Sequence, residues 1–91
     1  SALSMHEIEE ASVSHVFRAP AGSGSQMPVV MMENCRNVFL TECFALPGTD
    51  IFLEVSGQDS ANISLVGNDL SSAKTDVKLS AKVSKEQVRN K

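Results

Sequence analysis

The sequence has no tryptophan and no tyrosine, and its only aromatic residues are four phenylalanines. Surfaces that stack nucleic acid bases or sugar rings depend on exposed aromatic rings, so this composition argues against both. A formal net charge of -3 offers no attraction for a polyanion. The chain also lacks any run of about 18 apolar residues, the length that a membrane-spanning helix requires. We therefore expect neither nucleic acid nor a membrane as a partner.

Cysteine is equally scarce, with only Cys35 and Cys43. Their spacing does not match the Cys-x-x-Cys pairs of zinc sites, and no second pair exists, so we predict no metal and no cofactor. Two buried or half-buried free thiols are expected instead. The first residues lack the basic-then-apolar order of a signal peptide. We expect residues 1–91 to form a single domain that is a piece of a longer chain.

Charge is unevenly distributed along the chain. Residues 1–73 contain two basic and nine acidic side chains, whereas residues 74–91 contain six basic and two acidic ones. Such asymmetry can mark a tail that binds polyanions. Because the lysines at the end of the chain are spaced apart, the pattern favours a solvated strand edge.

The dominant pattern is a repeat of about 25 residues centred on Arg36–Gly57. In this stretch two short runs of alternating apolar and polar residues, typical of strands buried on one face, flank a Pro-Gly turn. One apolar series recurs at this spacing, and it comprises Val13, Val38, Ile63 and Val88, with His15, Leu40 and Leu65 two positions further on. A fixed period with two strands per repeat is typical of the stacked coils of a solenoid.

A second apolar series is interleaved with the first. It comprises Leu3, Val29, Ile51 and Val77, accompanied by Met5, Met31, Leu53 and Leu79. Two interleaved series predict two parallel sheets with one strand of each coil in each sheet. The expected strands are Leu3–His6, Ser12–Phe17, Pro28–Glu33, Asn37–Glu42, Asp50–Val55, Asn62–Val66, Asp76–Leu79 and Gln87–Arg89. Short third strands near Cys43–Ala45 and Asn68–Leu70 would complete a triangular section.

The predicted fold is therefore all-β, a short right-handed parallel β-helix of about three to four coils. An immunoglobulin-like β-sandwich is the alternative, since it also has short, closely spaced strands. The two folds differ in a testable way. The sandwich requires antiparallel pairing and gives no ladder of side chains 25 residues apart.

Asn37 and Asn62 occupy equivalent positions where a turn meets a strand. Side-chain amides stacked in this way can hydrogen bond from coil to coil, so we predict an asparagine ladder. The alternative is a carbohydrate-binding face formed by Asn37, Glu42 and Asn62 together with the loop Ala19–Met27.

Asn34–Gly57 and Ser60–Ala73 together resemble the C-terminal coils of right-handed parallel β-helix proteins related to glycoside hydrolase family 28, the polygalacturonase-like enzymes. The similar pieces are Asn-Val-x-Leu at 37–40, Asn-Ile-x-Leu at 62–65 and Leu-Pro-Gly-Thr-Asp-x-Phe-Leu at 46–53. This resemblance implies a polysaccharide such as pectin as the material processed. It also implies a secreted or periplasmic location for the parent protein.

Catalytic motifs of that family are missing from the sequence. The Asn-Thr-Asp, Asp-Asp, Gly-His-Gly and Arg-Ile-Lys motifs do not occur, and Gly67-Asn68-Asp69 lacks the second carboxylate that a glycosidase needs. We therefore predict no catalytic residue. His15 is expected to face the core or an open end, and His6 to belong to a solvated acidic turn rather than a metal site.

Three functional hypotheses follow from these patterns. The first is a non-catalytic, structural β-helix segment of a polysaccharide-processing protein, whose open coil ends or apolar face would make a homo-oligomer. Outward-pointing Phe39 and Phe52 are its candidate contacts. The second is a carbohydrate-binding module. The third is an enzyme completed only in an oligomer, with acids drawn from Asp50, Glu54, Asp69 and Asp76.

Overall fold

The computed structural model describes residues 3–16 and 28–90, which form strands and very little helix. The strands are β1 (Leu3–His6), β2 (Ala11–Ser14), β3 (Val30–Glu33), β4 (Arg36–Thr41), β5 (Ile51–Ser56), β6 (Ala61–Val66), β7 (Thr75–Leu79) and β8 (Val88–Asn90). A single 3-10 turn, η1 (Lys85–Gln87), precedes β8 and had not been predicted. The predicted strands are confirmed, with boundaries that differ by a few residues.

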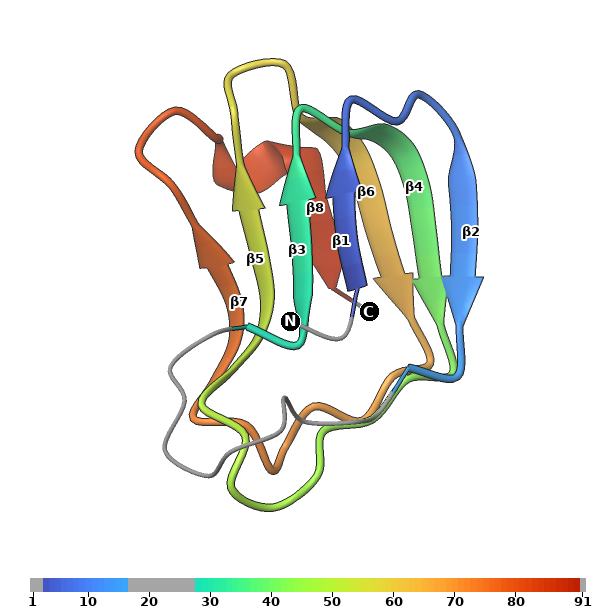
Figure 1. The fold of residues 1–91 in the computed structure, drawn as a ribbon, viewed down its shortest axis with the longest axis vertical. Coiled ribbons are helices and arrows are strands. Elements are labelled where there is room, and N and C mark those ends of the chain that lie inside the picture. The colour runs from blue at the N-terminus through green and yellow to red at the C-terminus, as the bar shows by residue number, and fades with distance from the viewer. Residues whose placement is uncertain (1–2, 17–27, 91) are drawn as a thin grey trace.

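The strands form two parallel sheets that face each other. Sheet A has the order β1-β3-β5-β7, and sheet B has the order β2-β4-β6-β8. In Figure 1 the chain rises along sheet A, crosses at the top, descends along sheet B and advances leftward with every turn. That path is right-handed, as expected for connections between parallel strands. The fold is therefore a right-handed β-solenoid of about three turns, and the predicted parallel β-helix is confirmed.

A third side closes the section of the coil below the two sheets. Phe44 and Asp69 form an isolated parallel bridge, and Ala45 N–H donates to Asp69 C=O at 2.9 Å. The predicted short strands around residues 43–45 and 68–70 are thus present as a single bridge. Every strand pair in the described residues is parallel, which excludes the antiparallel sandwich.

Apolar side chains from successive coils stack inside the solenoid. Leu40, Leu53, Ile63 and Leu65 have no exposed surface, and they form one core with Val38, Val55 and Met32. Val38 pairs directly with Ile63, at the predicted step of 25 residues. Burying each of these side chains contributes roughly 1.5–3 kcal/mol. The interior ladder therefore supplies most of the driving force for stacking the coils.

The predicted register of sheet A was wrong at two strands. Leu3 lies opposite Val30, Val30 opposite Leu53, and Leu53 opposite Val77, whereas Val29 and Ile51 had been predicted at the middle positions. The second series likewise runs Met5, Met32, Val55 and Leu79, not through Met31 and Leu53. The error arises because residues 29–32 are all apolar, so hydrophobicity does not show which of them face inward.

Sheet B was misaligned only at its first coil. Val13 lies opposite Leu40, and Ala11 lies opposite Val38. The first coil is two residues longer than the next, so a constant period misplaced everything before β4. His15 consequently does not stack on Leu40 and Leu65. It takes a left-handed backbone conformation (φ 61°), which ends β2 at Ser14, and its side chain is exposed.

The two phenylalanines predicted to point outward differ in environment. Phe39 is 47% exposed, as predicted, but Phe52 is completely buried and belongs to the core. Phe52 and Leu53 are consecutive residues of β5, and neither is exposed. Alternation therefore fails in this strand, because a parallel strand can bury both of its faces. The prediction that Phe52 is a surface contact is wrong.

Corners of the solenoid repeat a left-handed backbone conformation. One corner stacks Glu7, Asn34 and Gly57, and another stacks His15, Glu42 and Gly67. Asn and Gly adopt this conformation at low cost, whereas Glu and His do so only where the turn demands it. The corners are thus fixed by backbone geometry, which aligns polar side chains of neighbouring coils on the outside.

Polar side chains also point inward at two corners. Asn68 accepts a hydrogen bond from Cys43 N–H at 2.9 Å and donates to Leu40 C=O at 2.9 Å. Ser60 accepts from Cys35 N–H at 3.2 Å and donates to Ser56 C=O at 2.7 Å. These bonds satisfy backbone groups that the turn leaves without strand partners.

Candidate functional site

Asn37 and Asn62 form the predicted asparagine ladder on the outside of sheet B. Asn62 Nδ2 donates to Asn37 Oδ1 at 2.7 Å, and both residues have positive φ (54–56°). The next coil continues the ladder, since Asn62 N–H donates to Gln87 Oε1 at 3.3 Å. Both asparagine side chains are exposed. The ladder is confirmed as a structural feature, and it leaves amide edges open to solvent.

Arg89 adds a positive charge to this ladder. Its Nη2 donates to Asn62 Oδ1 and, at 3.1 Å, to Ser64 Oγ. Ser64 lies opposite both Phe39 and Arg89, so an exposed ring, a hydroxyl and a guanidinium form one row across the strands. We call Asn37, Phe39, Asn62, Ser64 and Arg89 the amide face.

Sequence reasoning found the two asparagines of the amide face but missed Ser64 and Arg89 as their neighbours. A signal was available, because Arg89 follows Ser64 by 25 residues, the same step that relates Asn37 to Asn62. The arginine had been grouped with the solvated lysines near the end of the chain.

Glu42, the third predicted carbohydrate-binding residue, does not belong to the amide face. It follows the end of β4, whereas Asn37 lies near its start, so the two are separated by about 16 Å of extended strand. Its carboxylate lies 3.6 Å from His15 Nε2 instead. The loop Ala19–Met27, also predicted to bind carbohydrate, lies outside the described residues.

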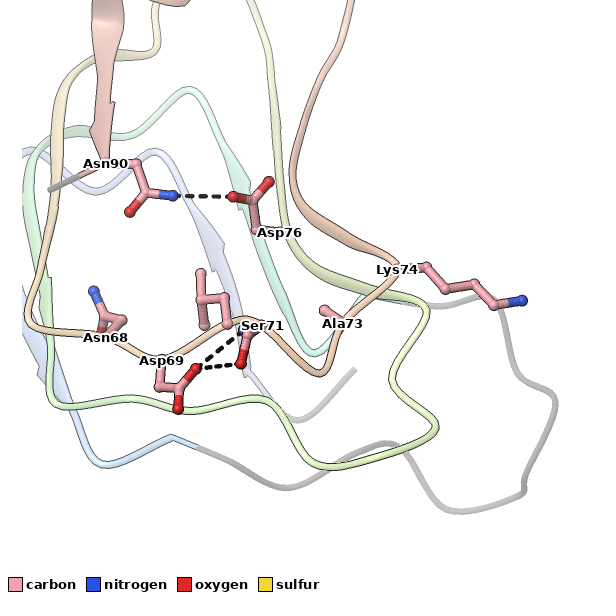
Figure 2. A pocket seen from close by; sticks show the side chains of 8 residues that line it. Asn68, Asp69, Ser71, Ala73, Lys74, Asp76 and Asn90 are labelled. Atoms are coloured by element: carbon pink, nitrogen blue, oxygen red, sulfur yellow. Dashed lines mark hydrogen bonds between the residues drawn. The ribbon is translucent and has the colours of Figure 1, made fainter.

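A second candidate site is an open hollow at the C-terminal end of the solenoid. Its volume is about 520 Å³, and its lining includes the carboxylates Asp69 and Asp76 (Figure 2). Asp69 Oδ1 accepts hydrogen bonds from Ser71 Oγ at 2.6 Å and from Ser71 N–H at 3.2 Å. These bonds hold the pKa of the Asp69 carboxyl below its usual value.

Asp76 is also engaged by its neighbours. Its Oδ2 accepts from Asn90 Nδ2 at 3.2 Å, and its Oδ1 accepts from Val77 N–H at 2.7 Å (Figure 2). A glycosidase needs one carboxyl with a raised pKa to protonate the leaving group. A depressed pKa makes Asp69 unsuited to that role. The other two acids considered, Asp50 and Glu54, are not among the residues that line this hollow.

Both histidines face glutamates on the surface. His6 Nδ1 lies 2.6 Å from Glu33 Oε1, and its Nε2 lies 3.6 Å from Glu7. The side chains of His6 and His15 are more than half exposed. Exposed pairs of this kind contribute only about 0–1 kcal/mol. They resemble other contacts between neighbouring coils, such as Arg36 with Glu9, rather than a catalytic site.

The two cysteines are free and buried, as predicted. Burial raises the pKa of the Cys43 thiol, which opposes formation of the reactive thiolate. In the described part of the chain, no three His, Cys, Asp or Glu side chains gather where they could hold a metal ion. Within residues 3–16 and 28–90, no helix is long and apolar enough to cross a membrane.

Comparisons of this chain with protein-family profiles, with curated proteins and with solved structures found no match. Its similarity to polygalacturonase-like proteins therefore rests on the coil motifs in the sequence and on the solenoid fold.

Proposed function

We propose that this chain is a non-catalytic β-helix segment of a polysaccharide-processing protein similar to the polygalacturonase-like enzymes, in which it has a structural role. One observation carries this proposal. The inward ladder runs through every coil from Leu3 to Val88, and the strands at both ends retain an unpaired side. Such a unit is suited to extend a stack of similar coils.

The non-catalytic part of the proposal is supported by the acids of the hollow. Asp69 has a depressed pKa, and both Asp69 and Asp76 already accept hydrogen bonds from residues beside them. The pair therefore has no evident proton donor for glycosidic cleavage.

A reducing-end assay on polygalacturonan tests this assignment. The wild-type chain, Asp69→Asn and Asp76→Asn should all release no more reducing ends than a heat-denatured sample. If wild-type protein cleaves the polymer and either variant loses that activity, the structural assignment fails. The third hypothesis, an enzyme completed in an oligomer, would then be favoured.

A second function, binding of an acidic polysaccharide, is favoured by the amide face. Arg89 retains guanidinium N–H groups beyond the Nη2 contacts described above, and these suit the carboxylate of a galacturonate unit. The Asn37 and Asn62 amides are exposed beside it and suit sugar hydroxyls. Phe39, 47% exposed, adds apolar area for the face of a sugar ring. A carbohydrate-binding role for Glu42 stays a prediction.

Isothermal titration with a short oligogalacturonide tests this second function. We expect Arg89→Gln to weaken binding at least about tenfold, because a charge-assisted hydrogen bond is lost. Lys78→Gln, an exposed change on the other sheet, is the matched control and should bind as the wild type does. A neutral maltooligosaccharide should bind more weakly than the uronate. No heat of binding at about millimolar oligogalacturonide would remove this function.

A further inference from the structure

Both ends of the solenoid present strand edges without a neighbour. β1 and β2 pair only with β3 and β4, and β7 and β8 pair only with β5 and β6. An edge strand carries backbone N–H and C=O groups that can pair with another chain. Because all strands of one sheet run parallel, the β7 edge of one copy is oriented to receive the β1 edge of a second copy shifted along the axis (Figure 1).

The apolar ladder is incompletely covered at these ends. Val77, Leu79 and Val88 are only partly buried, although they continue a ladder whose inner members, such as Leu53, are fully buried. An open hollow of about 240 Å³ lies between β7 and β8 and is lined by these three residues. At the other end Leu3 is likewise only partly buried. Each end thus offers apolar surface that another coil would cover.

The two ends carry opposite charge at the same corner. The β1–β2 connection exposes Glu7, Glu9 and Glu10, whereas the β7–β8 connection exposes Lys82 and Lys85. Both connections lie along the top of the solenoid in Figure 1, at its opposite ends. A second copy stacked end to end would therefore place its acidic corner against the basic corner of the first.

Pairing of opposite charges between coils already occurs at this corner within the chain. Arg36, which begins β4, lies 3.4 Å from Glu9 in the β1–β2 connection of the preceding coil. On sheet A, Lys78 lies opposite Glu54 in the same manner. Acid-against-base contacts between neighbouring coils are thus a general feature of this surface.

We propose that copies of this chain associate head to tail, with β7 of one copy pairing in parallel with β1 of the next. Val77 lies opposite Leu3 and Leu79 opposite Met5, which continues the ladder of sheet A across the junction. Such a contact joins two different surfaces, so it leaves a free end on each copy and builds open chains rather than closed dimers. This association is independent of the proposed function, since it does not require a bound polysaccharide.

Sedimentation velocity at low and high salt is the first test. At about 10 mM salt the Debye length is about 30 Å, whereas at about 1 M it is about 3 Å. We expect the average mass to grow with protein concentration at low salt and to fall toward the monomer at high salt. A monomer under all conditions, or a dimer that does not grow, overturns the proposal.

A charge exchange makes the test specific to the two ends. Lys82→Glu combined with Lys85→Glu, and Glu7→Lys combined with Glu10→Lys, should each be monomeric at low salt. Mixing the two variants should restore growth, because each new acidic end meets a new basic end. Loss of association without recovery on mixing, in variants with wild-type circular dichroism, contradicts the proposal.

The matched control for this exchange changes charge away from the ends. Glu42→Lys combined with Asp59→Lys, in the interior coils, alters the net charge by the same amount as the glutamate pair above. This control should still associate as the wild type does. A monomeric control would show that net charge, rather than the two corners, governs association and would overturn the assigned contact.

A disulfide experiment tests the register. Ser4 and Lys78 flank the ladder positions and would lie opposite each other, close enough for a disulfide across the junction. Oxidation of Ser4→Cys/Lys78→Cys should give covalent multimers, whereas Ser4→Cys/Asp76→Cys, shifted by two residues, should give far fewer. The native Cys35 and Cys43 are buried and do not compete. Equal cross-linking in both variants excludes this register.

Discussion

At the scale of single residues, Gly57 shows how a corner restricts sequence. Its φ is 89°, and a Cβ at this position would overlap Oδ1 of Asn34 in the preceding coil. That same oxygen accepts a hydrogen bond from Asp59 N–H at 3.2 Å. The asparagine of one coil thus occupies the space that the glycine of the next leaves free. Stacking at this corner therefore depends on both residues.

We expect Gly57→Ala to destabilise the protein by about 2–3 kcal/mol, through the positive φ and the clash with Asn34. Gly48→Ala is the matched control, since its φ is 92° but nothing lies within 4 Å of the added Cβ. This second change should cost only about 1 kcal/mol. Urea unfolding of both variants measures the difference. Equal destabilisation would show that backbone strain alone restricts the corner.

Cys43 gives a residue-scale prediction about pH. Its folded-state pKa is raised by burial, so its contribution to stability is complete below the pKa of the unfolded thiol. That contribution is lost as the pH rises from there through the folded pKa, because the unfolded chain loses the proton first. Urea unfolding between about pH 7 and pH 11 should therefore show wild-type stability falling more steeply than that of Cys43→Ala. Identical slopes would refute the linkage.

The asparagine ladder shows what single residues reveal before a structure is known. Asn37 and Asn62 were identified from their spacing alone, because an external ladder depends only on the length of the coil. Glu42 was grouped with them wrongly, since residues five apart on one strand lie at opposite ends of it. Arg89 was overlooked because its role depends on neighbours in the preceding coil.

At the scale of elements, β5 tests how parallel strands bury their residues. Phe52→Ala should cost about 3–5 kcal/mol, because a fully buried ring is removed from the core. Phe39→Ala, the same change on the exposed face of β4, should stay within about 0.5 kcal/mol of the wild type. Thermal unfolding of the two variants separates them. A small effect at Phe52 would mean that this ring does not support the core.

Strand identity was predictable from the sequence, but register was not. The 25-residue period placed every strand of sheet B within a few residues, because β4, β6 and β8 follow connections of constant length. In sheet A the steps between opposed residues are 27, 23 and 24, since the connections before its strands differ in length. Residues 29–32 add a second ambiguity, because a continuous apolar run is compatible with either face.

At the scale of the whole molecule, the solenoid is a chain of contacts between neighbouring coils. The strands β3, β4, β5 and β6 have a paired strand on both sides, whereas the four outer strands have one. In such an architecture stability is close to a sum of coil terms and terms between neighbours. The inner coils are therefore held by two interfaces and the end coils by one.

Native-state hydrogen exchange should reveal this gradient. In about 1 M salt, where the proposed end contacts are screened, amides of β4 and β5 should exchange at least about tenfold more slowly than those of β1 and β8. The end coils open by breaking one sheet interface each, whereas the inner coils open only when two are broken. At low salt and high protein concentration, head-to-tail pairing should raise the protection of β1 and β7 selectively, because those edges gain a partner. Uniform exchange across all the strands would instead show that the coils unfold as one cooperative unit, in which case the outer strands owe their stability to the entire stack.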